Sequence, residues 1–186
     1  MIRKILILIT LSNVLLFSSE LKKENKYFFQ IDIGNKENSF VSSYKKEDIL
    51  YDLAYSYWKT GEKYSIGINK YLMEGKYNLL LGSGISYKKN QIKLNMKTSI
   101  DTYQPLIKEK NLYYYLRGEY STEEKEYQLL SRIIQDKIAL DLVYQKSETY
   151  KKKSMIFNYK LDDIKSMRLG IDSKKNVFIG FTINTF

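Results

Sequence analysis

The feature that most constrains this chain is an alternation of apolar and polar residues with a period of two, which runs from about residue 27 to the end. Successive side chains of a β-strand point to opposite faces, so this pattern predicts strands with one apolar and one polar face. Such runs follow one another along the chain, separated by a few polar residues each. Short connections join antiparallel neighbours, and even spacing is typical of an up-and-down sheet.

The apolar faces of the clear runs contain no Asp, Glu or Arg. Representative runs are Ile49, Tyr51, Leu53 and Tyr55; Ile92, Leu94, Met96 and Ile100; Ile138, Leu140, Leu142 and Tyr144; and Val177, Ile179, Phe181 and Ile183. A weaker run covers residues 40–45. Two longer breaks are expected, at residues 102–111, which contain the single proline Pro105, and at residues 147–153.

The number and length of the runs indicate a membrane barrel. There are about twelve, each near the 9–11 residues with which a tilted strand crosses a bilayer. Twelve strands close into a ring that side chains do not fill, so an apolar lining would leave a costly dry void. We therefore predict an all-β, antiparallel up-and-down transmembrane β-barrel with its apolar face outward. Ten strands is the alternative count, and a secreted soluble β-sheet protein is the competing fold.

Tyrosines near the ends of the apolar faces fit the aromatic girdles of such barrels. They include Tyr27, Tyr57, Tyr64, Tyr77, Tyr87, Tyr120, Tyr127 and Tyr144. The β-propensity of tyrosine explains any one of them equally well, and only their joint placement favours girdles.

The first residues have the composition of a secretory signal. Arg3 and Lys4 precede an apolar run over residues 5–17, and Ser18 and Ser19 follow. The run is shorter than the roughly 20 residues of a spanning helix, which favours a cleaved signal peptide. We expect residues 1–18 to be removed and residues 19–186 to form the barrel.

The C-terminal strand carries Gly180, Phe181, Ile183 and the final Phe186. This ending resembles the terminal strand of bacterial outer-membrane β-barrel proteins, a small porin-like class, although Phe186 lies one position off the apolar register. The resemblance covers this strand only and implies no particular family. It implies a membrane-insertion signal, the barrel-assembly machinery and outer-membrane lipid as partners, and the outer membrane of a Gram-negative bacterium as location.

With the apolar face outward, the polar face lines the lumen. Its expected charges are Lys93, Lys97, Arg117, Glu119, Arg132, Asp141, Lys160, Arg168 and Asp172, with Asp32 and Asp52 on earlier strands. Rings of charge set ion preference in pores, and the basic excess predicts a preference for anions. The alternative is that these charges pair with one another and seal the barrel. Glu123 and Glu124 are expected to be solvated in a turn.

The amino-acid composition excludes several classes of function. The absence of His and Cys excludes His-based catalytic groups, His or Cys metal ligands and disulfides, so neither an enzyme nor a cofactor or metal site is expected. The net charge of +10 does not indicate a nucleic-acid partner, because the predicted signal peptide directs the chain out of the cytosol. The predicted function is a minimal pore for small polar or anionic solutes. A sealed structural barrel and a secreted soluble β-sheet binding protein are the alternatives.

The orientation follows from strand parity. With both ends of the barrel in the periplasm, counting back from the C-terminus puts residues 147–153 outside the cell and residues 102–111 in the periplasm. The oligomeric state and the solute are not predicted by any feature of the sequence.

Overall fold

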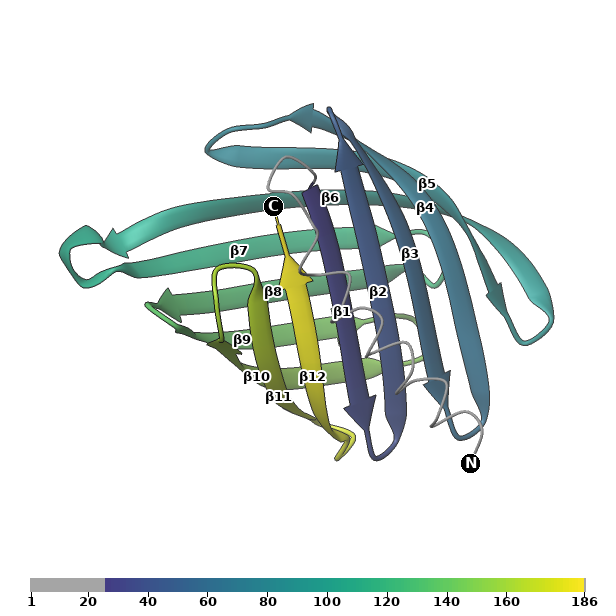
Figure 1. Cartoon of the computed structure of the whole chain (residues 1–186). Coiled ribbons are helices and arrows are strands. Elements are labelled where there is room, and N and C mark those ends of the chain that lie inside the picture. Colours follow the sequence, from purple (N-terminus) through teal and green to yellow (C-terminus); the bar gives the residue numbers. More distant parts are fainter. Residues whose placement is uncertain (1–25, 186) are drawn as a thin grey trace.

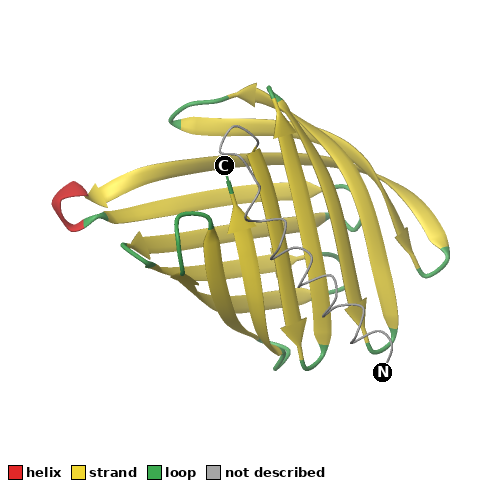
Figure 2. Ribbon diagram, viewed as in Figure 1, coloured by secondary structure: helices red, strands yellow, loops and turns green. Residues whose placement is uncertain are grey.

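The computed structural model describes residues 26–185, and these form twelve antiparallel strands closed into a barrel (Figure 1). The strands are β1 (Lys26–Gly34), β2 (Glu37–Lys46), β3 (Ile49–Trp58), β4 (Gly61–Met73), β5 (Tyr77–Lys88), β6 (Gln91–Ile107), β7 (Leu112–Ser121), β8 (Glu126–Gln135), β9 (Ile138–Lys146), β10 (Lys151–Lys160), β11 (Lys165–Asp172) and β12 (Val177–Asn184). One short 3₁₀ turn, η1 (Lys108–Lys110), is the only helical element in this part of the chain (Figure 2). The predicted up-and-down barrel of twelve strands is confirmed. The expected signal peptide lies outside the described residues.

Each strand pairs with its neighbours in sequence, and β1 closes the ring against β12. Phe28 lies opposite Asn184, so β1 begins at the end of the barrel where β12 finishes. We call this end the terminal rim; it holds the turns after β2, β4, β6, β8 and β10. The distal rim holds the other six turns. The turn at residues 147–150 lies on the distal rim and the turn at residues 108–111 on the terminal rim, as strand parity predicts.

The outer wall of the barrel is apolar and exposed. Ile66, Leu94 and Leu142 are 63%, 80% and 52% exposed, although all three belong to paired strands. Tyrosines form short rows on this wall, as where the rings of Tyr55 and Tyr64 lie 4.7 Å apart. So much exposed apolar surface is incompatible with water and suits lipid.

No helix within residues 26–185 is long and apolar enough to cross a membrane.

Three sequence predictions about strand limits are wrong. The break predicted at residues 147–153 is shorter, because residues 151–153 belong to β10 and pair with β9. The weak run at residues 40–45 is the full strand β2, paired along its length with β1 and β3. The break predicted at residues 102–111 is mostly strand, because β6 stays paired with β7 as far as Ile107 opposite Leu112. The register shifts between Pro105 and Ile107, and such an irregularity accommodates a residue without a backbone N–H. Only residues 108–111 remain as a turn.

Candidate functional site

The register places all nine predicted lumen charges on the inner wall. Lys93 lies opposite Ser86, Lys97 opposite Gly82, and Arg132 opposite Asp141, each on the face that carries the buried polar residues. Arg117, Glu119, Lys160, Arg168 and Asp172 occupy the same face of their strands. The inner wall is therefore polar around the barrel, and its charges fall into small groups with different partners.

The strongest pair joins Arg132 on β8 to Asp141 on β9. The Arg132 Nε donates to Asp141 Oδ1 at 2.6 Å and an Nη donates to Oδ2 at 2.8 Å, so the contact is bidentate. The Asp141 side chain is only 2% exposed. Two parallel charge-assisted hydrogen bonds fix both side chains against the wall. This pair is a rigid, neutral element of the lining.

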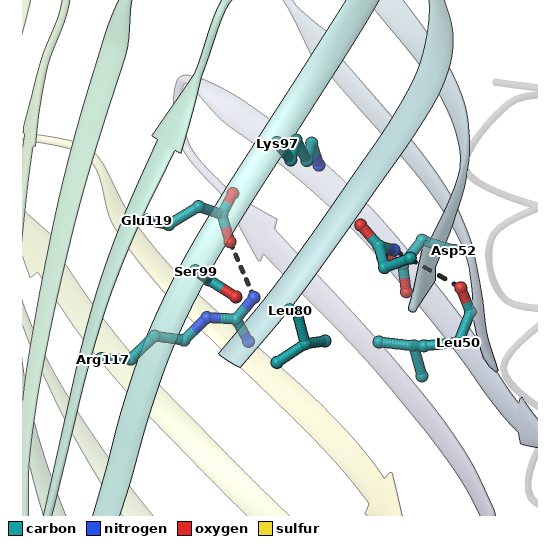
Figure 3. Close-up of a pocket in the computed structure, with 8 residues that line it drawn as sticks. Leu50, Asp52, Leu80, Lys97, Ser99, Arg117 and Glu119 are labelled. Carbon is teal, nitrogen blue, oxygen red and sulfur yellow. Dashed lines mark hydrogen bonds and ion pairs between the residues drawn. The ribbon is translucent and has the colours of Figure 1, made fainter. Parts of the chain in front are cut away.

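A second group lies on the inner wall from β3 to β7. Arg117 donates to Glu119 at 2.7 Å, and the Asn69 amide donates to Asp52 at 2.6 Å. These side chains surround a recess of about 20 Å³, enough for roughly one water molecule (Figure 3). Lys97 also lines the recess, and no ion pair within 4 Å joins it to any residue of the described chain.

The third group crosses the closure of the barrel. The Arg168 Nε lies 3.7 Å from Asp32 Oδ1, and both residues are less than 10% exposed. Gly180 of β12 lies opposite both of them, between β11 and β1. A Cβ at Gly180 would overlap Asp32 Oδ1 and lie 2.6 Å from the Ile31 carbonyl oxygen. The glycine of the terminal-strand pattern thus leaves room for a lumen ion pair.

The other residues of the proposed insertion signal face away from the lumen or lie beyond it. Phe181 and Ile183 alternate with the inward Gly180 and Thr182, which puts them on the outer register of β12. Phe186 lies outside the described residues. The role of these residues in insertion stays a prediction.

Sequence reasoning missed several inner charges near the distal rim. Lys152 bridges Glu37 at 3.0 Å and Asp172 at 3.3 Å. Glu37 precedes the weaker run predicted at residues 40–45, and Lys152 lies in the break predicted at residues 147–153, but both belong to strands. Continuing the polar register one or two steps beyond the predicted strand ends would have found them.

The prediction that Glu123 and Glu124 are solvated in a turn is wrong. The Glu123 side chain is 2% exposed and binds Lys63 at 2.8 Å, while Glu124 binds Lys88. The turn is held beside β6, since the Thr122 N–H donates to the Met96 carbonyl at 3.0 Å. Burial alone would raise the pKa of Glu124, but its hydrogen bond to Lys88 and the nearby lysine charges outweigh burial and hold the pKa below its usual value. This turn reaches over the distal mouth.

The pairing leaves few lumen charges free. Lys93 and Lys97 have no carboxylate within 4 Å in residues 26–185, and Lys93 is exposed although it lies on the inner face. Lys160 is 3.4 Å from the exposed Asp163. No cluster in the described residues has the three or more His, Cys, Asp or Glu side chains that would hold a metal ion. The inner wall thus offers charged and hydrogen-bonding groups to a solute.

Comparison with known proteins supports the same class. No protein family matches the sequence, and no curated protein matches it. Solved structures with the same fold include the KdgM porin (TM-score 0.59, 12% identity), the Acinetobacter baumannii outer membrane protein Omp33 (0.63, 7%) and the NanC porin (0.57, 8%). Each match covers 86% of this chain and 98% of the other.

The chain therefore has the fold of small bacterial outer-membrane porins. This fold and the apolar outer wall place the protein in the outer membrane. At sequence identities of 7–13%, these similarities establish the fold and do not establish solute specificity.

Proposed function

We propose that the protein is a minimal outer-membrane pore for small polar or anionic solutes. A ring of twelve strands is wider than the eight-stranded ring that side chains just fill. The inner wall is polar, and Lys93, on the polar register of β6 near the distal mouth, is exposed. These features favour a hydrated passage over a sealed structural barrel.

The observation that carries the proposal is the contrast between paired and unpaired lumen cations. Arg117, Arg132 and Arg168 each lie beside a carboxylate, so their net field in the lumen is small. Lys93 and Lys97 are not paired. They stand four residues apart on the inner face of β6, or about 13 Å along the strand. Two fixed positive charges in line raise the local anion concentration and repel cations.

The neighbouring structures are compatible with this class of solute. A KdgM porin structure is described as a complex with disordered oligogalacturonate, which is a polyanion. For the present chain the proposal is limited to small polar or anionic solutes.

Planar bilayers test the proposal. The purified protein should conduct, and its reversal potential under a salt gradient should indicate a preference for anions. Lys93→Glu/Lys97→Glu should abolish or reverse this preference. Lys46→Glu/Lys76→Glu changes the same charge on the terminal rim outside the lumen and is expected to alter it much less. Because salt screens fixed charge with a Debye length of about 10 Å at 0.1 M, the preference should weaken as salt rises.

Two results would reject the proposal in different ways. Cation preference of the unmodified protein would overturn the charge argument and leave a pore of another selectivity. Absence of conductance in protein that remains folded by its heat-dependent gel mobility would favour the sealed barrel.

A further inference from the structure

The two rims of the barrel differ in charge. Every turn of the terminal rim carries at least one carboxylate, such as Glu74 or Asp136. On the distal rim, carboxylates occur only in the turns at residues 122–125 and 147–150, and Glu123 and Glu124 of the first turn bind lysines at the mouth. Near β4 the outer side of the distal rim also carries Glu62, which accepts hydrogen bonds from Tyr55 and Tyr64. The part of this rim beside β8 to β11 is basic, whereas the terminal rim has both signs of charge.

Several lysines of the distal rim lie close together, where β8 and β10 begin and β9 and β11 end. We call this group the basic patch; it comprises Lys125, Lys146, Lys151, Lys153 and Lys174, all exposed. Its one carboxylate, Glu148, is bound to Lys125 at 2.6 Å. The other four lysines have no ion pair within 4 Å in the described chain.

The register brings two of these lysines directly together. Lys146 of β9 and Lys151 of β10 are cross-strand partners, with their side chains on the same outer face. Like charges in directly opposed positions destabilise a sheet. Lys153 follows two positions later on the same face, and Ser173 donates its N–H to the Lys153 carbonyl at 2.7 Å, which brings the turn of Lys174 alongside. An anion between these ammonium groups would remove the repulsion.

On the outer wall, the type of side chain changes stepwise from the basic patch toward the middle of the strands. Tyr144 is the next outward residue on β9, and the Lys151 ammonium lies 5.6 Å from its ring centre. Leu142 and Met155 follow as an exposed apolar pair. Charge, aromatic ring and aliphatic side chain thus succeed one another, as at the boundary between lipid headgroups and hydrocarbon. Lys146, Lys151 and Lys153 lie on the outer register at the distal rim, away from the lumen, where lipid headgroups would border a bilayer around the barrel.

We propose that the basic patch binds the phosphate groups of a phosphorylated glycolipid in the outer leaflet of the outer membrane. Such a lipid complements both parts of the surface, with its phosphates on Lys146, Lys151 and Lys153 and its acyl chains along Leu142 and Met155. Attraction of basic groups to an anionic lipid surface grows with each lysine near the surface. The site lies on the outer wall, so it is independent of whether the lumen conducts.

Native mass spectrometry of the full mature protein in non-ionic detergent tests the site. The probes are diphosphorylated lipid A, its dephosphorylated form and inorganic phosphate. The protein should retain diphosphorylated lipid A and lose most of its affinity when the phosphates are removed. Lys146→Gln/Lys151→Gln/Lys153→Gln should weaken binding by about tenfold or more.

The matched control is Lys46→Gln/Lys70→Gln/Lys137→Gln, which removes three exposed lysines from the terminal rim. It should bind the lipid as the unmodified protein does. Equal affinity for the two lipid forms, equal loss in both triple variants, or unchanged binding after removal of the patch lysines would overturn the proposal. If inorganic phosphate protected the barrel from heat as well as lipid A does, the site would be a general phosphate site, and the lipid assignment would be wrong. Circular dichroism of each variant establishes that the barrel is intact.

Discussion

Leu140 and Asp141 are adjacent in β9, yet their side chains occupy opposite environments. Leu140 is 37% exposed on the outer wall and pairs with Ile133 and Phe157 of the neighbouring strands. Asp141 is 2% exposed, and its carboxylate binds Arg132. In a soluble protein a buried aspartate would be unusual, and so would the continuous apolar surface to which Leu140 belongs, although a single exposed leucine would not. Here the leucine faces lipid, and a guanidinium replaces the water around the aspartate, so the inner wall depends on paired charges.

The largest effect is expected from breaking that inner pair. Arg132→Met leaves the buried Asp141 carboxylate without a partner, and removing one member of a buried ion pair costs about 3–5 kcal/mol. Urea unfolding in micelles, followed through the single tryptophan Trp58, measures the loss. The double variant Arg132→Met/Asp141→Leu should recover most of it. A double variant as unstable as the single one would show that the inner wall does not depend on this pairing.

A slightly smaller effect is expected from the outer face of the same strand. Leu140→Arg puts a charge into lipid in mid-strand, which costs about 2–4 kcal/mol near the bilayer midplane. The fraction of barrel that resists unfolding on an unheated gel should fall. Gln145→Arg, on the inner face of β9, introduces the same side chain and should assemble nearly normally. Equal assembly of the two variants would contradict the assignment of the faces.

The closure of the barrel gives a third test through its glycines. Gly180→Ala places a Cβ against Asp32 and the Ile31 backbone, so Asp32 or the strand must shift, at a cost of about 1–3 kcal/mol. Gly118→Ala on the outer face of β7 meets only the Ile100 Cγ2 at 3.9 Å and is expected to be tolerated. Thermal unfolding of the two variants makes the comparison. Similar stability would mean that the Asp32–Arg168 pair adapts without strain.

The alternation of side chains was enough to predict the barrel and its strand count, and it put the predicted charges on the polar register of their strands. It was insufficient for the ends of β2 and β6, because polar residues and Pro105 resemble turn residues until the partner strand is known. The alternation was also insufficient to predict specific ion pairs. Arg168 and Asp32 meet only because the barrel closes and Gly180 leaves room between them.

The prediction for the β7–β8 turn was wrong for a different reason. Its sequence, Thr122, Glu123, Glu124 and Lys125, is that of a solvated turn. What turns Glu123 inward is the presence of Lys63 on a strand far away in sequence, together with the hydrogen bonds that hold Thr122 to β6. Local composition holds no information about either.

The smallest expected effect concerns that turn and its dependence on pH. The pKa of Glu124 is lowered in the folded protein, so its contact with Lys88 stabilises the fold above the usual glutamate pKa and is lost as pH falls through the lowered value. Glu124→Gln should be less stable than the unmodified protein at neutral pH, by at most about 1 kcal/mol because solvent screens the pair. This difference should disappear in acid, below the lowered pKa. Glu148→Gln, which removes the exposed partner of Lys125, should show a smaller difference at neutral pH. Thermal unfolding across the acid range checks both variants, and a Glu124→Gln difference that grew on acidification would contradict the inward contact of the turn.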